Sequence, residues 1–261
     1  MLFFSILIIL VSVACISGCI DICNLANRDG PTVYRVGVGA EYPPMTYIDT
    51  DGTWRGLDIE SIQWIGEEMG FEVAIVPFVW KNWLPMLKSK RIDMVHTGMT
   101  ITPERAEIIN FSNPYLIVDQ AVVSHMDSKY TMEDFFEGKG KIGVQTGTTA
   151  EKWIVENLIE NEMILPSQLV QYDSLSFAHR ALSEKKIDFA MHDLPITRNT
   201  IVNLPLSIIG TIETKEKYGI GLRKDDIELL QTINEGFDRL MASPKWTELL
   251  EKYVLESYAS V

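Results

Sequence analysis

Apolar and polar residues alternate along this chain in two periods, one typical of strands and the other of helices. Residues 34–38 alternate like a strand, residues 59–69 carry Ile, Ile, Ile and Met at helical spacing before Gly70, and residues 71–77 return to the strand pattern. A short helix over residues 83–87 and a strand that begins at Ile92 follow. Because strands and helices take turns, the first half predicts βαβ units.

The second half repeats this alternation. Strand patterns are predicted over residues 118–124, 141–144, 169–172 and 189–191, and helical patterns over residues 132–136, 150–160 and 174–184. A strand over residues 218–222 and two amphipathic helices over residues 225–241 and 244–253 complete the pattern. The whole chain therefore predicts an α/β protein with mainly parallel sheets flanked by helices.

Two stretches with the same residue spacing indicate two similar lobes. Residues 87–93 and 182–188 each place Leu, a basic pair and Ile-Asp at identical positions, where a helix passes into a strand. The first strand leads to residues 98–105 and the second to His192-Asp193. Since ligands of open α/β sheets bind beyond the carboxyl ends of the strands, each lobe is expected to contribute a polar group to one site.

Residues 98–105, Gly-Met-Thr-Ile-Thr-Pro-Glu-Arg, suggest an anion site. Thr102 followed by Pro103 is typical of an N-cap and first turn, so a helix is predicted to begin beside Arg105. The guanidinium, the Thr100 hydroxyl and the unpaired amides of the helix start then suit one carboxylate or phosphate. The alternative is an ordinary surface helix in which Arg105 pairs with a neighbouring glutamate.

Composition and charge exclude several classes of protein. With 261 residues, 46% of them apolar, the chain is long enough for one large core or two smaller ones, and we expect two lobes. The formal net charge is -13 without any basic run, which argues against nucleic acid as a partner. The four histidines show no ligand spacing and no cysteine support, so no metal and no other cofactor is expected.

The first residues are predicted to export the chain. Residues 2–16 are nearly all apolar but too few to span a membrane, and residues 16–19, Ile-Ser-Gly-Cys, resemble the lipobox of exported lipoproteins. That resemblance implies a signal peptide over residues 1–18, a lipid on Cys19 that holds the protein at the outer face of the cytoplasmic membrane, and a tether over residues 19–32. The first four residues contain no Lys or Arg, so the alternatives are a true start that lies upstream and an uncleaved anchor, and the domain is exported in either case. All three cysteines lie in these N-terminal segments, which leaves none for a disulfide in the domain.

An ordered set of motifs resembles one protein family. The set comprises Tyr42-Pro43-Pro44, Gly56-Leu57-Asp58, Asp93, residues 98–105, residues 111–115, residues 143–149, Asp188, Asp193 and Tyr218-Gly219. In this order the motifs resemble the polar amino acid substrate-binding proteins of ABC importers, the family 3 extracellular solute-binding proteins, which have the two-lobed periplasmic-binding-protein type II fold. The resemblance covers the chain from about Tyr34 onward. It implies a monomeric receptor that captures a polar amino acid and delivers it to the permease and ATPase subunits of an importer.

The same resemblance implies how the chain is divided. Lobe 1 is expected to comprise residues 33–117 and 214–261, and lobe 2 residues 118–213, joined by two crossover strands that act as a hinge. Closing the hinge brings the two halves of the site together, so the free energy of ligand binding shifts the lobes toward the closed form.

The resemblance also assigns roles to individual residues at the charged end of the ligand. Arg105 is expected to clamp the α-carboxylate bidentately, helped by Thr100 and by the backbone of Thr149. Thr148 or Thr149 is expected to cap the helix that begins there. Asp193 is expected to take the α-ammonium, so that the site suits a zwitterion.

Other positions are expected to surround the ligand side chain. Tyr42 and Trp80 fall at the family's flanking aromatic positions, although core packing is the commoner fate of such rings. Gln145 occupies a position that varies with specificity, and Gly98 opens the anion-binding loop. Gly39 stands where some relatives keep an acid, which argues against a strongly cationic ligand such as lysine or arginine.

A related class of enzyme is the main alternative. Cyclohexadienyl dehydratases share this fold and much of this motif order, and they need an acid in the cleft to drive elimination from prephenate or arogenate. Residues 194–197, which follow Asp193, contain no carboxylate, and Glu41 is the one obvious substitute. We therefore expect binding without turnover.

Overall fold

The computed structural model describes residues 30–255. The chain from Thr32 onward forms one compact unit, and this unit contains all four hydrophobic clusters found among the described residues. The predicted signal peptide, the lipidation of Cys19 and the tether up to residue 29 lie outside the described residues. Between residues 30 and 255, no helix is both long and apolar enough to cross a membrane.

The first lobe is built on a five-stranded sheet with the order β5-β1-β6-β13-β7. Its strands are β1 (Thr32–Gly39), β5 (Phe71–Phe78), β6 (Met94–Val95), β7 (Asn110–Phe111) and β13 (Gly221–Leu222). Strands β5, β1 and β6 are parallel, and β13 is antiparallel to both of its neighbours. Three adjacent strands thus show the parallel pairing that the α/β alternation predicts.

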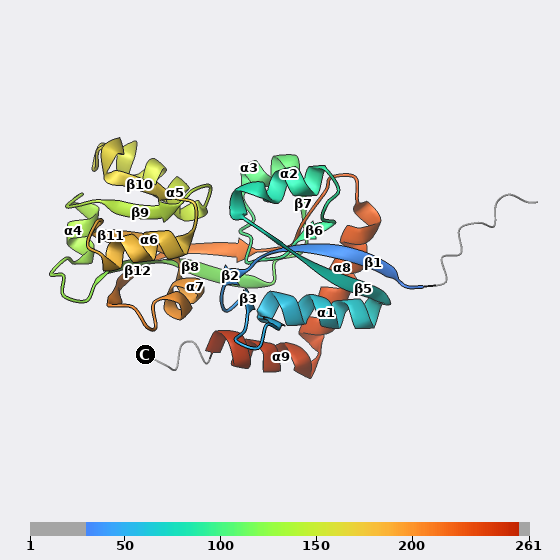
Figure 1. Ribbon diagram of the computed structural model, residues 1–261. Helices are drawn as coiled ribbons and strands as arrows, with labels where there is room; N and C mark the ends of the chain where they lie inside the picture. Colours follow the sequence, from blue (N-terminus) through green and yellow to red (C-terminus); the bar gives the residue numbers. More distant parts are fainter. Residues whose placement is uncertain (1–29, 256–261) are drawn as a thin grey trace, which may run out of the picture. The chain divides into compact units, whose positions relative to one another are not determined.

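Helices cover both faces of this sheet (Figure 1). Met94 packs in a cluster with α1 (Leu57–Met69), α8 (Ile227–Ala242) and α9 (Pro244–Leu250). Its neighbour Val95 packs in a second cluster with α2 (Trp83–Lys88). Successive side chains of a strand point to opposite faces, so the two clusters lie on opposite sides of the sheet.

The second lobe has the same plan, with the strand order β10-β9-β11-β8-β12. Its strands are β8 (Leu116–His125), β9 (Ile142–Gln145), β10 (Leu169–Tyr172), β11 (Phe189–Asp193) and β12 (Leu206–Tyr218). Strands β10, β9 and β11 are parallel, whereas β8 is antiparallel to β11 and β12. Phe189 packs with α4 (Met132–Phe136) and α5 (Thr149–Ile154), and the next residue, Ala190, packs with α6 (Leu175–Ser183) on the other face.

The remaining elements are short. They are α3 (Pro103–Ile108), α7 (Leu194–Thr200), a small sheet of β2 (Glu41–Tyr42), β3 (Thr46–Ile48) and β4 (Trp54–Arg55), and the turns η2 (Trp80–Asn82), η3 (Val155–Ile159), η4 (Pro166–Gln168) and η5 (Glu251–Leu255).

Two long strands connect the lobes. β8 and β12 pair antiparallel from Leu116 opposite Tyr218 to His125 opposite Leu206. At the first-lobe end the backbone N–H of Tyr115 donates to the carbonyl of Tyr218 over 3.0 Å, which carries the pairing up to the first sheet. A two-stranded ribbon with both strands running between the sheets is the structural basis of a hinge.

The predicted strand over residues 218–222 is divided in the structure. β12 ends at Tyr218 because the N–H of Gly219 turns away from the ladder and donates to the carbonyl of Met99 over 3.0 Å. The chain then resumes as β13, which lies between two strands of the first sheet. The predicted helix over residues 150–160 is present without a break: α5 continues directly into η3, which has the wider π-helical turn.

Candidate functional site

A pocket of about 480 Å³ lies between the carboxyl ends of strands from the two lobes. All nine residues predicted as ligand contacts line it: Tyr42, Trp80, Gly98, Thr100, Arg105, Gln145, Thr148, Thr149 and Asp193. Strand ends and the loops that follow them supply these residues in both lobes, as expected for ligand sites of α/β sheets. The structure thus brings the nine positions together, and their roles toward a ligand remain predictions.

Arg105 faces the pocket from the first turn of α3. Its backbone N–H donates to Thr102 Oγ1 over 3.2 Å, and Pro103 occupies the first turn, so the predicted N-cap is confirmed. The guanidinium donates to the carbonyl oxygens of Thr100 and Gly147 over 2.8 and 3.1 Å, and its carbon lies 5.2 Å from the centre of the Trp80 ring.

The guanidinium of Arg105 has no carboxylate within salt-bridge distance among the described residues. Its neighbour Glu104 pairs instead with Lys152 of α5, at 2.7 Å. Burial lowers the pKa of Arg105, and the nearby carboxylates of Asp193 and Glu216 oppose that shift. A half-buried cation held by carbonyl dipoles is suited to an anionic group of a ligand.

The loop before Arg105 owes its shape to Gly98. Gly98 has a φ of 60°, and a Cβ there would lie 2.9 Å from the ring of Tyr42. Its N–H donates to the buried carboxyl of Asp58 over 2.6 Å, and the Tyr115 hydroxyl donates to the same oxygen over 3.0 Å. Burial raises the pKa of Asp58 to about 7. Gly98 therefore serves the pocket through its backbone.

Asp193 ends β11 and is buried beneath the pocket. Its carboxylate accepts hydrogen bonds from the Tyr42 hydroxyl over 3.1 Å, from Gln120 Nε2 over 2.6 Å and from the Tyr218 hydroxyl. Burial raises the pKa of Asp193, and the donors Tyr218, Gln120 and Tyr42 act in the opposite direction. The neighbouring His192 also lines the pocket, and burial lowers its pKa to about 4, so its ring is neutral.

The second lobe contributes the start of α5 and the end of β9. Thr148 is the N-cap: its Oγ1 accepts from the N–H of Glu151 over 3.4 Å and donates to the carbonyl of Gln145 over 2.7 Å. The Gln145 amide lies 3.5 Å from the carbonyl of Asp173, so it is weakly held. Thr149 Oγ1 donates to Glu216 over 2.7 Å.

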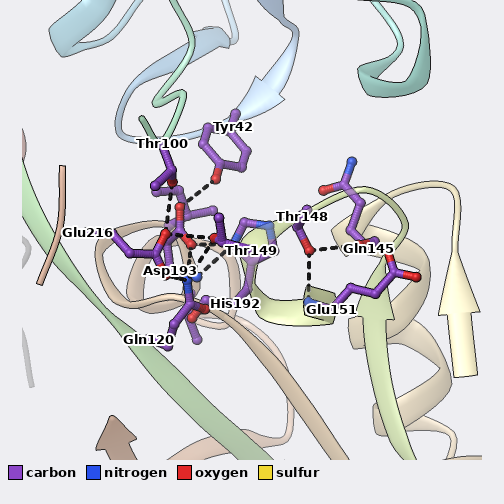
Figure 2. A network of polar contacts seen from close by, with 12 residues as sticks. Tyr42, Thr100, Gln120, Gln145, Thr148, Thr149, Glu151, His192, Asp193 and Glu216 are labelled. Atoms are coloured by element: carbon purple, nitrogen blue, oxygen red, sulfur yellow. Dashed lines mark hydrogen bonds and ion pairs between the residues drawn. The ribbon is translucent and has the colours of Figure 1, made fainter. Parts of the chain in front are cut away.

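Sequence reasoning missed Gln120 and Glu216. Figure 2 shows both beside Asp193, with Gln120 Nε2 donating to Asp193 over 2.6 Å and to Glu216 over 2.8 Å. Glu216 stands two residues before the Tyr218-Gly219 motif, in a run of alternating charges that is typical of a solvent-exposed strand. That proximity to the motif was the one signal available.

Several contacts bridge the lobes at the pocket mouth. Trp80 Nε1 donates to the carbonyl of Gly147 over 3.2 Å, and Lys81 pairs with Asp173 at 3.2 Å. Glu41, the proposed substitute acid, lines the mouth as an exposed side chain and accepts from Ser176 at 3.4 Å. These contacts describe a closed arrangement of the two lobes.

No group of metal-ligating side chains occurs within the described part of the chain.

The sequence matches the model of one family, bacterial extracellular solute-binding proteins, family 3, over residues 34–256. A curated relative, the probable histidine-binding protein of Neisseria gonorrhoeae, is 24% identical over 253 residues, which are 93% of each chain.

Solved structures agree with the two-lobed type II fold. An ancestral arginine-binding protein bound to arginine has a TM-score of 0.77 and 30% identity, with coverage of 85% of this chain and 98% of that one. An ancestral amino acid-binding protein described as a precursor of cyclohexadienyl dehydratase has a TM-score of 0.74 and 28% identity, with coverage of 85% and 94%.

Proposed function

The chain belongs to the bacterial extracellular solute-binding proteins of family 3, and we propose that it captures a polar amino acid between its two lobes and delivers it to an ABC importer. The observation that carries this proposal is that Arg105, whose guanidinium has no carboxylate partner among the described residues, and the carboxylate of Asp193 line the same pocket. A free amino acid at neutral pH carries one negative and one positive group. Arg105 and Asp193 are the matching cation and anion.

The remaining lining residues set what side chain fits. Tyr42 and Trp80 offer aromatic surfaces, and the loosely held amide of Gln145 offers both a donor and an acceptor. Gly39 leaves out the acid that a strongly cationic ligand requires, and a polar side chain therefore fits best. The histidine and arginine named for the relatives differ from each other, so the relatives indicate the ligand class rather than one amino acid.

The proposal includes where the protein works and how the chain is divided. The protein is exported. We assign a lipid on Cys19 that anchors it at the outer face of the cytoplasmic membrane. There it acts as a monomer and delivers its ligand to the permease and ATPase subunits of the importer. Residues 33–117 with 214–261 form lobe 1 in this assignment, and residues 118–213 form lobe 2. The strand orders support this division, because β8 and β12 each cross one boundary.

Binding without turnover is favoured over a dehydratase. Elimination from prephenate or arogenate requires a general acid aimed at the ligand. Glu41 is exposed at the mouth, and the carboxylate of Glu216 accepts hydrogen bonds from Thr100, Gln120 and Thr149. Neither glutamate is placed as a free acid inside the pocket.

A thermal-shift screen tests this function. Protein unfolded and refolded to remove carried ligand is melted with each protein amino acid, and with prephenate and arogenate. Ligand at 100 times its Kd adds about 2.7 kcal/mol, which raises the midpoint by roughly 5 to 10 °C in a chain of this size. A shift with one or a few amino acids is the expected result. A shift only with prephenate or arogenate, followed by their turnover, would overturn the proposal.

A further inference from the structure

The carboxylate of Glu216 accepts hydrogen bonds from three separate segments (Figure 2). Thr100 Oγ1 and Thr149 Oγ1 donate to its Oε2 over 2.9 and 2.7 Å, and Gln120 Nε2 donates to its Oε1 over 2.8 Å. Thr100 follows β6 in the first lobe, Thr149 begins α5 in the second, and Gln120 lies on β8. One side chain on β12 therefore bonds both lobes and the other crossover strand.

The backbone of β12 is irregular at this point. The ladder with β8 shifts register by one residue between Ile208 and Gly210, and it shifts again after Ile212 and resumes at Glu216, so residues 213–215 all stand opposite Asp119. Lys215 has a φ of 52°, and its N–H donates to Asp119 Oδ1 over 3.0 Å. Bulges of this kind redirect the side chain that follows, and here that side chain is Glu216.

The same two hydroxyls are candidates for contact with a ligand carboxylate. A threonine hydroxyl has one hydrogen, so Thr100 and Thr149 cannot donate to Glu216 and to a ligand at the same time. In the closed arrangement a ligand carboxylate therefore depends on Arg105 and on backbone N–H groups. Burial and the neighbouring Asp193 raise the pKa of Glu216, and its three donors act against that shift.

We propose that Glu216 is a positioning residue for ligand capture: its carboxylate joins Thr100 to Thr149 when the lobes close, and so sets the balance between open and closed forms. This inference rests on the proposed receptor function. A ligand that binds the closed form gains apparent affinity in proportion to how often that form is populated. Glutamine at this position keeps the size, but its amide is uncharged and has one acceptor oxygen: the hydrogen bond from Gln120 is lost, and the bonds from Thr100 and Thr149 are no longer charge-assisted, so the closed form is weakened.

The experiment measures the distance between the lobes directly. The unit from Thr32 onward contains the four hydrophobic clusters of the described residues and has no cysteine, so it carries its own cores and accepts site-specific labels. Lys88→Cys on α2 and Ser167→Cys on η4 place nitroxides at exposed positions, one in each lobe. Electron–electron double resonance then gives the distance distribution without ligand, and calorimetry gives the affinity for the amino acid found in the screen.

Glu216→Gln is expected to move the ligand-free distances toward longer values and to weaken binding at least tenfold. Glu213→Gln, at an exposed position of the same strand, is the matched control and should leave both quantities unchanged. Glu216→Asp keeps two acceptor oxygens and is expected to recover part of the closed population. If Glu216→Gln has a lower melting temperature but keeps the wild-type distances and affinity, Glu216 contributes to stability alone, and the proposal is overturned.

Two further outcomes are separated by design. If Glu216→Gln does not fold by circular dichroism, Thr149→Val removes one of the donors and is expected to lengthen the distances, with Thr149→Ser as the rescue; wild-type distances in Thr149→Val overturn the proposal. If no amino acid binds the wild-type protein, the receptor function fails. The ligand-free distances still decide whether Glu216 controls closure.

Discussion

Arg105 places a full positive charge at the pocket. Its guanidinium donates hydrogen bonds to the carbonyl oxygens of Thr100 and Gly147. Carbonyl dipoles orient the guanidinium without neutralising it. A ligand carboxylate can exchange these bonds for charge-assisted ones, which are shorter and stronger. A cation–π contact with Trp80, whose ring centre lies 5.2 Å from the guanidinium carbon, stabilises the charge at the pocket wall.

Arg105→Ala is therefore expected to weaken amino acid binding by roughly 30-fold or more, since losing a charged, hydrogen-bonded partner from a closed site costs about 2–5 kcal/mol. Isothermal titration calorimetry with the amino acid found in the screen measures the affinity of this variant. Arg180→Ala removes an exposed arginine of α6 and should bind like the wild type. Retained affinity in Arg105→Ala would show that the carboxylate binds elsewhere.

Asp58 gives a pH dependence to the loop that holds Gly98. Its pKa is raised from 3.8 to about 7 by burial, so the folded protein keeps a proton that the unfolded chain has lost above pH 4. The free energy of unfolding contributed by this group is present below pH 4 and is lost as the pH rises to 7. His96 Nδ1 lies 3.6 Å from Asp58 Oδ2, and burial lowers the pKa of His96 to about 3. His96 therefore stays neutral between pH 4 and pH 7 in the folded state.

In Asp58→Asn the acceptor for the Gly98 N–H remains and the titration disappears. The stability of the variant relative to wild type should therefore rise from pH 4 to pH 7, as measured by urea unfolding at each pH. His96 is present in both proteins and cancels in the difference. Asp238→Asn, at an exposed position of α8, is the control. A flat difference would mean that Asp58 ionises normally in the folded protein.

At the scale of elements, the bulge of β12 is an irregular backbone feature beside the site. Lys215 adopts a left-handed conformation that β-branched residues avoid, whereas two residues later Lys217 lies in regular strand opposite Ile117. Both lysines are exposed, so their side chains contribute little by packing.

Lys215→Val should lower the stability by about 1–2 kcal/mol, because valine resists this backbone conformation. Lys217→Val should be neutral or slightly stabilising, because valine favours extended strand. Chemical denaturation of the two variants side by side makes the comparison. Equal stabilities would contradict the bulge.

How much could be predicted from the sequence depended on the range of the interactions. The helix beside Arg105 was predictable because its cap is local: Thr102 accepts from a backbone N–H three residues on. The two-lobed fold was predictable because strand and helix periods persist over whole elements. Glu216 was not, because its partner Thr100 lies 116 residues away and its orientation depends on a register shift between two strands.

At the scale of the whole molecule, two ion pairs among the described residues join the lobes, one of them at the pocket mouth. Lys81 and Asp173 lie 3.2 Å apart with 62% and 65% of their side chains exposed, and Lys152 and Glu104 lie 2.7 Å apart. Exposed pairs contribute about 0.2–1 kcal/mol each and are screened by salt. These ion pairs therefore make only a small contribution to the stability of the closed form.

Lys81→Ala should therefore weaken amino acid binding by no more than about fivefold, and the deficit should shrink as salt rises. Titrations at low and high sodium chloride measure both effects. Lys90→Ala, at an exposed first-lobe position, is the control. A loss as large as that expected for Arg105→Ala would assign Lys81 to the ligand itself.

The placement of β13 has a consequence for the order in which the molecule is completed during synthesis. β13 lies between β6 and β7, although more than one hundred residues separate it from them in the chain. The core strands of the second sheet, by contrast, come from one continuous stretch. As the chain emerges from the ribosome or the export channel, the second lobe can assemble first. The first lobe must wait with a gap in its sheet until Gly221 and Leu222 arrive.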